Sequence, residues 1–424
     1  MPWSEVSVVE LRKEFVMLAG QPGAKVASLC RRFGISRKTG YKWLGRAAAG
    51  EMALSNRSRR PGSSPRRTAE EMEASVLAVR EAHPCWGGRK IARRLHDLGW
   101  SDVPAPSTVT AILRRHGVAL GQAVPAGPFQ RFERARPNEL WQMDFKGHFA
   151  LASGRCHPLT VLDDCSRFNL CLAACGNERS ETVQSHLRSA FRRYGLPDWI
   201  IADNGSPWGN GPDTPYTPLG VWLLRLGIGV SHSRPYHPQT LGKEERFHRT
   251  LKAELLAGPP FGDLRHCQTA FDRWRLVYNC ERPHQALDMD VPATRYRPSE
   301  RSFPEALPPI EYGSEHKVRR VQQLGWINFK GKAFRLPKAF AGYPVGLVPT
   351  TDDGLWHVIF ASRHIAEIDL RNGSSKTVTH VSEQVLPISQ VHTPSGRGVR
   401  GHRKRSSGPF RPRTPASAKR WWEG

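Results

Sequence analysis

The chain has 424 residues, of which 39% are hydrophobic, and its 63 Lys and Arg against 38 Asp and Glu give a formal net charge of +25. This length allows several domains, and the charge favours a polyanionic partner over general solubility as its explanation. The excess is uneven: residues 1–137 carry 24 basic and 11 acidic residues, residues 371–424 carry 11 and 2, and the middle holds the remaining 28 and 25. A nearly neutral core between two basic arms is predicted to be brought to nucleic acid by its flanks.

The start of the chain lacks a basic segment followed by an apolar run, and no stretch approaches the ~18 apolar residues of a membrane span. The eight cysteines form no Cys-x-x-Cys pair, so neither a zinc ribbon nor a redox motif is indicated. We therefore expect a reduced, cytoplasmic and nucleoid-associated protein without a membrane partner.

Apolar spacing in residues 1–49 predicts a helix-turn-helix domain, with helices over 6–19, 24–33 and 37–44. Cys30 supplies a small residue where helices approach, Gly34 suits a left-handed turn, and Ser36 is a good N-cap. The last helix would present its polar face to a major groove, and an ordinary helical hairpin is the alternative. The candidate DNA contacts on that face are Arg37, Lys38, Tyr41 and Lys42.

An Arg-rich linker is expected over 50–67, followed by a second helical domain over 68–124 with helices at 70–82, 88–98 and 107–116. Ser107 is expected to cap the third helix, which Gly117 would end. Helical spacing makes Arg89, Lys90 and Arg93 candidate DNA contacts, although a structural three-helix spacer is also compatible. Residues 125–137 are interpreted as a hinge.

In residues 138–305, three short predicted strands (140–151, 157–163, 168–174) are followed by alternating helices and strands. This order of elements indicates an α/β layer fold. The later elements are expected at 178–194 (helix), 199–203 (strand), 218–226 (helix), 228–231 (strand), 240–256 (helix) and 264–279 (helix).

Three acidic residues are the candidate catalytic and metal-binding residues of this region: Asp144 in a strand, Asp203 ending another strand, and Glu245 near the start of a helix. If they converge, they form an all-oxygen site for hard divalent cations. Two cations about 3.5–4 Å apart can activate an attacking oxygen and stabilise a leaving one in phosphoryl transfer. We expect Mg²⁺ or Mn²⁺, two ions, with Asp144 bridging them.

The motifs of this segment resemble the catalytic core shared by retroviral integrases and bacterial insertion-sequence transposases. The matching stretches are Trp141-x-x-Asp144, Leu162 to Phe168, Asp203 to Pro207, and Pro235 to Arg246. The resemblance implies a ribonuclease-H-like fold with an acidic triad and divalent metal. It also implies that Asp163 and Asp164 are not ligands, and that Ser166 and Arg167 support them.

Glu244 competes with Glu245 for the third acidic position, and helical geometry separates the two. At about 100° per residue, Glu244 falls within the buried stripe of Phe247 and Leu251, whereas Glu245 lies outside it. Glu245 then shares a face with Arg249 and Lys252, and these two residues with Lys243 are candidate DNA contacts. His237 and His248 are expected near the site, either as supporting groups or as ordinary surface residues.

Asp203 and Glu245 are 42 positions apart, and the resemblance leaves the Gly- and Pro-rich stretch 208–217 between them unexplained. Short strands over 315–370 predict a small β-barrel, and the basic composition of 371–424 predicts a disordered tail.

The leading hypothesis is a multidomain transposase that binds terminal inverted repeats and target DNA as a homodimer or larger assembly, then cleaves DNA ends and transfers strands. A transposase-derived DNA-binding regulator without catalytic activity is the main alternative, and a plain nuclease is another.

Overall fold

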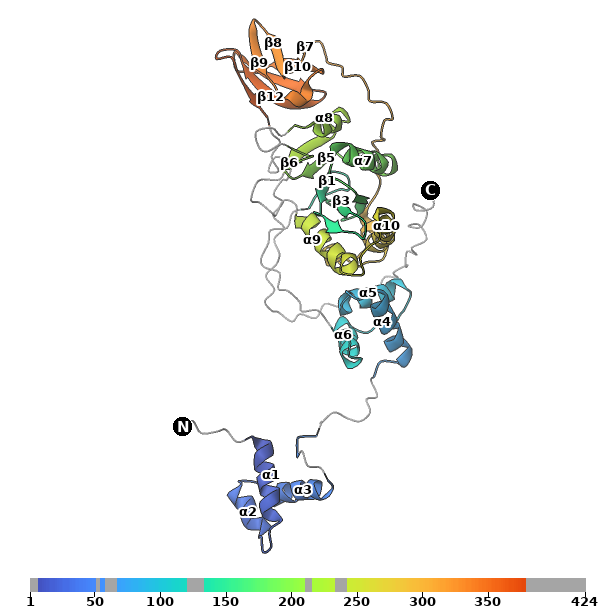
Figure 1. Cartoon of the computed structure of the whole chain (residues 1–424), viewed down its shortest axis with the longest axis vertical. Helices are drawn as coiled ribbons and strands as arrows, with labels where there is room; N and C mark the ends of the chain where they lie inside the picture. Colours follow the sequence, from blue (N-terminus) through green and yellow to red (C-terminus); the bar gives the residue numbers. More distant parts are fainter. Residues whose placement is uncertain are drawn as a thin grey trace, which may run out of the picture. The chain divides into compact units, whose positions relative to one another are not determined.

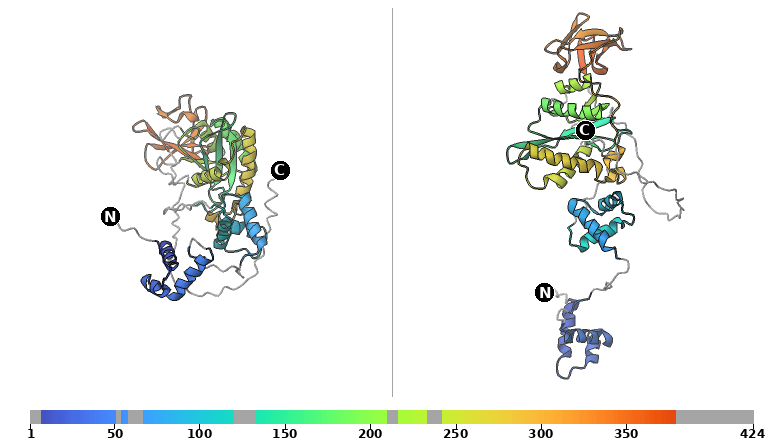
Figure 2. Two further views of the ribbon diagram at one scale, coloured as in Figure 1. Left: turned by 60° about the horizontal axis from the view of Figure 1, so that its bottom comes forward. Right: turned by 90° about the vertical axis from the view of Figure 1, so that its right-hand side faces the viewer.

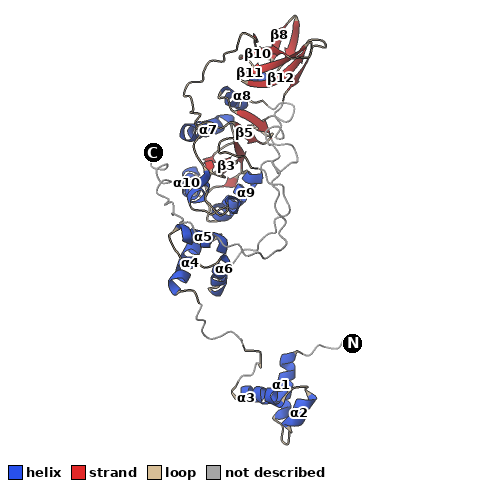
Figure 3. Ribbon diagram, turned by 180° about the vertical axis from the view of Figure 1, so that it is seen from behind, coloured by secondary structure: helices blue, strands red, loops and turns tan. Residues whose placement is uncertain are grey.

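The computed structural model describes residues 7–50, 54–57, 67–119, 133–209, 216–232 and 242–378. The chain divides into two units, residues 1–68 and 69–424. Helices alone make up the described elements before residue 116, helices and strands alternate up to residue 295, and strands dominate beyond it (Figure 3). The expected linker over 50–67 and hinge over 125–137 fall largely outside the described residues.

The first unit contains α1 (Val8–Ala19), α2 (Val26–Arg32) and α3 (Arg37–Ala48), close to the predicted helices. Gly34 adopts a φ of 64°, and the Ser36 hydroxyl accepts a hydrogen bond from the Thr39 amide at 3.2 Å. A Cβ at Gly40 would lie 2.6 Å from Cys30 Sγ, so α3 approaches α2 at two small residues. The three features that mark a helix-turn-helix in the sequence therefore have the expected local structure.

The second unit begins with α4 (Glu70–Ala82), α5 (Gly88–Asp97) and α6 (Pro106–Arg115) around their own apolar core (Figure 1). The prediction that Ser107 caps α6 is wrong. The N-cap is Ala105, no side chain caps this helix, and Pro106 stands at its first turn, where its missing N–H costs nothing. Gly117 ends the helix with a φ of 71°, as expected.

The central sheet has the order β2-β3-β1-β5-β6, and β4 pairs with β3. Pairing is antiparallel between β1 and β3 and between β3 and β4, whereas β1, β5 and β6 run parallel. The strand bounds are β1 Leu140–Phe145, β2 Phe149–Ala150, β3 Arg155–Asp163, β4 Asn169–Cys175, β5 Trp199–Ala202 and β6 Gly229–His232. An antiparallel meander followed by parallel strands agrees with the predicted order of three strands and then alternating helices and strands.

Helices cover both faces of this sheet (Figure 2). One layer comprises α7 (Ser180–Tyr194) and α8 (Pro218–Arg225), which pack on side chains such as Trp141 and Met143. The opposite layer comprises α9 (Gly242–Leu251) and α10 (Leu264–Cys280), which pack on residues such as Leu162. The predicted helix over 240–256 is divided, because a π-helical turn η2 (Lys252–Leu256) follows α9. Two short helices, η3 (Gln285–Leu287) and α11 (Pro292–Arg295), come after α10.

The C-terminal part is rich in strands. A five-stranded antiparallel sheet has the order β13-β12-β11-β10-β7, and β8 and β9 form a separate hairpin. The bounds are β7 Lys317–Arg320, β8 Trp326–Phe329, β9 Lys332–Arg335, η4 Lys338–Phe340, β10 Pro344–Pro349, β11 Leu355–Phe360, β12 Arg363–Asp369 and β13 Ser374–Thr377. Its apolar core includes Val221 and Leu224 of α8.

Two expectations for this part change. The described strands pair as an open sheet and a hairpin, so the predicted barrel is not shown. The predicted disordered tail begins too early, because residues 371–378 hold a turn and β13, which pairs with β12. Residues 379–424 lie outside the described part of the chain. None of the described helices is long and apolar enough to cross a membrane.

Candidate active site

Two of the predicted acids lie at the carboxyl ends of neighbouring parallel strands. β1 pairs with β5 in a register that aligns Trp141 with Ile200 and Gln142 with Ile201. Continuing this register two positions aligns Asp144 with Asp203, and adjacent strands are about 4.8 Å apart. The ends of parallel strands are where α/β sheets usually bind ligands. The sheet therefore places two carboxylates side by side at one edge.

A short turn fixes the direction of Asp203. Its Oδ1 accepts a hydrogen bond from the Gly205 amide at 3.0 Å, and its carbonyl is 2.9 Å from Nδ1 of His232, which ends β6. A Cβ at residue 205 would lie only 3.2 Å from Asp203 Oδ2. Glycine at this position thus leaves room for the carboxylate beside the turn.

Helix α9 supplies the third acid and packs against β1. Glu244 is completely buried, and Phe247 and Leu251 are buried below it, whereas Glu245 is exposed. This is the division between the two glutamates that helical periodicity predicts. The three acids are not packed into one tight cluster: the one group of three possible ligands within 4.8 Å of one another among the described residues lies elsewhere, in the C-terminal sheet.

Electrostatics show that the acids nevertheless influence one another. The pKa of Asp144 is raised to about 7, first because the carboxylate is buried, and then because Asp203, Glu178 and Glu245 add negative charge. The pKa of Asp203 is also raised, mainly by burial and in part by Glu178. Burial and acidic neighbours that raise the pKa of a carboxylate in this way mark a site that a cation would stabilise.

Sequence reasoning missed Glu178, the fourth acid of this neighbourhood. It lies between β4 and α7, and its Oε1 is 2.8 Å from Nδ1 of His157 on β3. No motif marked it, since a single acid before a helix is common. Its position follows only from the antiparallel pairing of β3 with β4, which brings His157 opposite Cys175.

A buried polar group lies directly behind Asp144. Thr160 faces Asp144 across the β1–β3 pairing, and its hydroxyl lies 3.0 Å from the Asp144 carbonyl, 3.0 Å from Glu244 Oε2 and 2.8 Å from His248 Nε2. His248 Nδ1 is 3.9 Å from Asp144 Oδ2. Burial raises the pKa of Glu244 well above its usual value, and burial lowers that of His248 to about 4. Neutral forms of both side chains therefore support the strand that carries Asp144.

Asp163 and Asp164 have structural partners. Asp163 is fully buried and accepts hydrogen bonds from the Ser166 amide and hydroxyl, at 2.7 and 2.6 Å, and from the Asn138 amide at 2.7 Å. Asp164 accepts one from Gln142 on β1 at 2.8 Å and forms an ion pair with Lys243 on α9. Asp164 thus connects the strand of Asp144 with the helix of Glu245.

This ion pair gives Lys243, a predicted DNA contact, a partner within the protein, and its contact with DNA stays a prediction. The Lys243 side chain is only 14% exposed, and burial lowers its pKa to about 8. A lysine held in this way positions α9 against the strand of Asp144. Arg249 and Lys252 are exposed, as a DNA contact requires.

Lys90 and Arg93 of α5 are also engaged within the protein. Lys90 pairs with Glu254 at 3.7 Å, and Arg93 pairs with Asp97 and with Asp290, both at 2.9 Å. Their predicted DNA contacts stay predictions, but part of their helix face lies against acids that follow the central sheet in the chain. Arg89, on the same helix, is exposed.

The predicted contacts of α3, namely Arg37, Lys38, Tyr41 and Lys42, are all exposed, and Tyr41 is 62% exposed although it is aromatic. Trp43 of the same helix is buried, and the guanidinium of Arg12 lies 3.9 Å from its ring centroid. His237, the motif residues 235–241 and most of the 208–217 stretch are outside the described residues, so their predicted roles stay predictions.

Comparison with known protein families agrees with this organisation. The integrase core domain family matches residues 134–238, and a second integrase core domain family matches 226–292. The C-terminal domain of IS481 family transposases matches 316–376. A helix-turn-helix domain matches 11–62 and a homeodomain-like domain matches 39–113.

Individual relatives include two insertion-element proteins. The chain is 28% identical over 158 residues to the IS407 uncharacterised 31.7 kDa protein of Burkholderia multivorans (strain ATCC 17616 / 249), covering 37% of this chain and 54% of that protein. It is 25% identical over 280 residues to the IS476 uncharacterised 39.2 kDa protein of Xanthomonas euvesicatoria, covering 64% of this chain and 78% of that protein. The chain thus spans about half of the first relative and most of the second.

A solved simian T-cell lymphotropic virus intasome, in complex with PP2A regulatory subunit B56 gamma, matches at 17% identity and a TM-score of 0.35, covering 67% of this chain and 95% of that one. At that TM-score the likeness decides nothing about this chain. The family matches show that residues 134–292 are similar to integrase core domains. The C-terminal sheet is similar to the corresponding domain of IS481 family transposases, the N-terminal part matches a helix-turn-helix domain, and two of the relatives are insertion-element proteins.

Proposed function

We propose that this protein binds the terminal inverted repeats of an insertion sequence, cleaves the DNA ends and joins them to target DNA. The observation that carries the proposal is the pair Asp144 and Asp203 at one level on parallel strands, with the pKa of Asp144 raised to about 7 by burial and by the acids around it. Carboxylates and a DNA phosphodiester are both negatively charged. A site with several carboxylates can therefore act on a phosphodiester only if cations neutralise this charge.

The residues present fit a divalent cation. Asp144, Asp203 and Glu245 offer only oxygen atoms, which Mg²⁺ and Mn²⁺ prefer, and Mg²⁺ keeps several waters, so three carboxylates are sufficient. These three residues would hold the metal, as two ions in our proposal. When bound, the ions supply activation of the attacking oxygen and stabilisation of the leaving one. Glu178 stands near enough to add to the negative potential.

The chain's own residues orient this site. The Thr160 hydroxyl holds the backbone of Asp144, His248 lies beside the Asp144 side chain, and the Lys243–Asp164 ion pair holds α9. The exposed Arg249 and Lys252 lie close after Glu245 in the chain and would contact the phosphate backbone.

End recognition is proposed for α3 of the first unit, with Arg37, Lys38, Tyr41 and Lys42 directed to the major groove. In the second helical group, we retain Arg89 as a DNA contact. There α6 is the third helix, the position of a recognition helix in homeodomain-like folds, and its Ser107, Thr108 and Arg114 are exposed. Two ends must be brought together for strand transfer, so a homodimer or larger assembly is proposed.

Substituting Glu245→Gln tests the proposed chemistry. Full-length protein is incubated with Mg²⁺ and a labelled DNA fragment that carries the terminal repeat flanking its own gene. Removing one charged ligand is expected to reduce cleavage and strand transfer by at least about 100-fold, roughly 2.7 kcal/mol of barrier, while end binding in a mobility-shift assay stays within about twofold.

Glu181→Gln is the matched control, because Glu181 is an exposed glutamate on α7 in the opposite helical layer. Near-normal cleavage by Glu245→Gln would refute the triad. End binding without any metal-dependent cleavage by the unaltered protein would favour the catalytically inactive regulator.

A further inference from the structure

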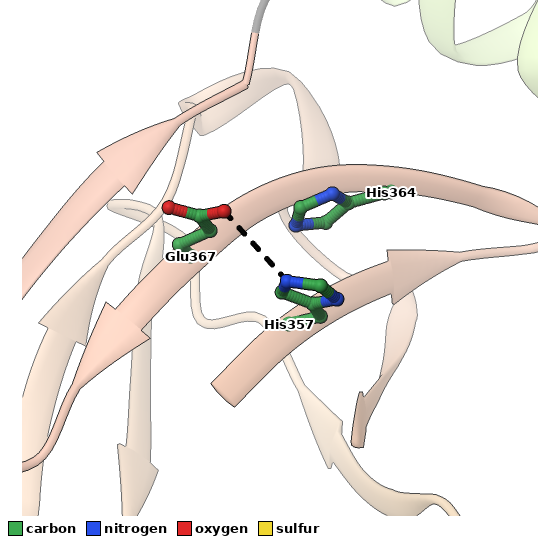
Figure 4. A group of neighbouring side chains, drawn as sticks. All are labelled: His357, His364 and Glu367. Carbon is green, nitrogen blue, oxygen red and sulfur yellow. Dashed lines mark ion pairs between the residues drawn. The ribbon is translucent and has the colours of Figure 1, made fainter. Parts of the chain in front are cut away.

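A cluster of two histidines and one glutamate lies on the C-terminal sheet, far along the chain from the acids of the integrase core. His357 comes from β11, and His364 and Glu367 come from β12 (Figure 4). One ligand atom from each residue lies within 4.8 Å of the others. All three residues are partly exposed, so the group is accessible to ions from solvent.

An irregularity in β12 creates the cluster. Side chains of a regular strand alternate between faces, so residues 364 and 367, three positions apart, would point in opposite directions. The register with β11 passes from Val358↔Ala366 to Ile359↔His364, which leaves Ile365 as an extra residue. This β-bulge turns both His364 and Glu367 to the outer face, where His357 also lies, and bulges commonly re-aim side chains at functional sites.

Burial confirms the shared face. On β11 the flanking residues Trp356 and Val358 are buried while His357 is not, and on β12 both Ile365 and Ala366 are buried between the two partly exposed ligand candidates. The rings of His357 and His364 are 4.0 Å apart between centroids, and His357 Nε2 is 3.7 Å from Glu367 Oε1.

These distances suit a tetrahedral zinc ion with little adjustment. Bonds of about 2.0–2.1 Å at tetrahedral angles separate neighbouring ligand atoms by about 3.3 Å. The distance of 3.7 Å between His357 Nε2 and Glu367 Oε1 is already near that value. Rotation of the partly exposed side chains can bring a ring nitrogen of His364 to a similar distance. Two imidazoles and one carboxylate are a ligand set that Zn²⁺ accepts, with water in the fourth position.

The hydrogen bond of His364 supports this role. Its Nε2 is 2.9 Å from the Ala366 carbonyl, which requires the proton on Nε2 and places the lone pair on Nδ1. Metal-binding histidines usually donate their second N–H to a carbonyl or carboxylate in this manner, because it orients the ring and makes the ligand nitrogen more basic.

We propose that His357, His364 and Glu367 bind one Zn²⁺ ion that cross-links β11 and β12. The site is independent of the proposed DNA chemistry. The bond between the strands stabilises the C-terminal sheet. Lys376 of β13, opposite Glu367 in the register, is a basic competitor for that carboxylate.

Zinc titration of the full-length protein, stripped with a chelator, tests the proposal. The parent protein for the test carries Asp144→Asn and Glu245→Gln, so that the acids of the core do not contribute to binding. Calorimetry is expected to show one Zn²⁺ per chain, and Co²⁺ substitution is expected to give the intense visible absorption of a four-coordinate site. Zinc is also expected to raise the thermal midpoint of the parent.

His357→Ala and His364→Ala, each made in the parent, are expected to weaken zinc binding by at least about tenfold and to abolish the cobalt spectrum. His96→Ala, an exposed histidine on α5, should retain both, and Lys376→Gln should bind at least as tightly as the parent. Circular dichroism of the zinc-free proteins distinguishes lost binding from lost folding. If the parent takes up no zinc, or if the histidine variants keep its stoichiometry, the three residues form only a cross-strand ion pair and the proposal fails.

Discussion

Asp144 shows how strongly a single side chain can depend on distant parts of the chain. Its carboxylate is close to residues from β5 and α9, which lie about 60 and 100 positions away, and to Glu178. These three neighbours are acidic, and the site is partly buried, so the ionised form of Asp144 costs free energy in the folded protein without a cation. This cost should be visible as a dependence of stability on pH.

Asp144→Asn is expected to raise the thermal midpoint at pH 8 by roughly 2–6 °C, about 1–2 kcal/mol after allowing for partial exposure. The folded pKa of about 7 exceeds the reference value of 3.8, so the wild type loses stability as pH rises between these values. Below about pH 4 both states are protonated and the gain should disappear. Differential scanning fluorimetry from pH 4 to 8 measures this, and a gain that is independent of pH would contradict it.

Periodicity was sufficient to separate Glu244 from Glu245, because burial within a helix follows its 3.6-residue repeat. Periodicity could not reveal that Lys243 pairs with Asp164, 79 positions earlier, or that Glu178 stands beside the predicted acids. These partners depend on how strands pair and how a helix packs on them, and neither is encoded in a local spacing.

Among the elements, α5 departs most from its sequence-based interpretation. Its basic residues suggested a face that reads DNA, yet Lys90, Arg93 and Arg94 pair with Glu254, Asp290 and Glu281. The hydrophobic pattern predicted the helix correctly. Its positive charge did not show whether these basic side chains face DNA phosphates or carboxylates of the same chain, and in the structure they pair with carboxylates.

Charge reversal tests this contact. Arg94→Glu is expected to destabilise the docking of α5 by about 1–3 kcal/mol, because it leaves Glu281 beside a second negative charge in a partly buried position. Glu281→Arg in the same chain should restore most of the loss. Hydrogen exchange of the α5 amides measures both, and Arg89→Glu on the exposed side is the control. Two independent, additive losses in the double variant would contradict the pairing.

Most strands of the central sheet were predictable from alternating and continuous apolar runs, although the single strand expected over 140–151 is divided into β1 and β2. The strands β12 and β13 were not predicted. Their sequence contains Arg363, His364 and Glu367, and the bulge at Ile365 interrupts the alternation that marks a strand. A strand whose alternation of apolar and polar residues is interrupted cannot be recognised from its sequence alone, and it becomes evident only from its pairing with a neighbouring strand.

At the scale of the whole molecule, charge is divided among parts with different tasks. The helix-turn-helix unit exposes basic residues on α3, and the integrase core is close to neutral. Under the proposed function, non-specific attraction to DNA is expected to come mainly from the flanking regions and to weaken as the salt concentration rises, because the release of counterions from DNA then contributes less free energy.

Removing two basic side chains of α3 tests this division. Arg37→Ala with Lys42→Ala is expected to weaken end binding and to reduce the slope of log affinity against log salt by about 1–2, since each lost phosphate contact accounts for about 0.9. Fluorescence anisotropy over a range of KCl concentrations measures the slope. Lys13→Ala, an exposed lysine on α1, should change it less. Equal effects of both variants would mean that α3 is not the DNA-binding face.

The alignment of Asp144 with Asp203 also limits how this chain can change length. Insertion of one residue within β1 or β5 would move a carboxylate by about 3.3 Å and turn it to the other face. Residues added after Asp203 change neither the position nor the face of the two carboxylates. The long stretch between Asp203 and α8 lies after Asp203 in this way. Evolution can therefore lengthen the interval before Glu245 freely, provided that each acid keeps its place on its own strand or helix.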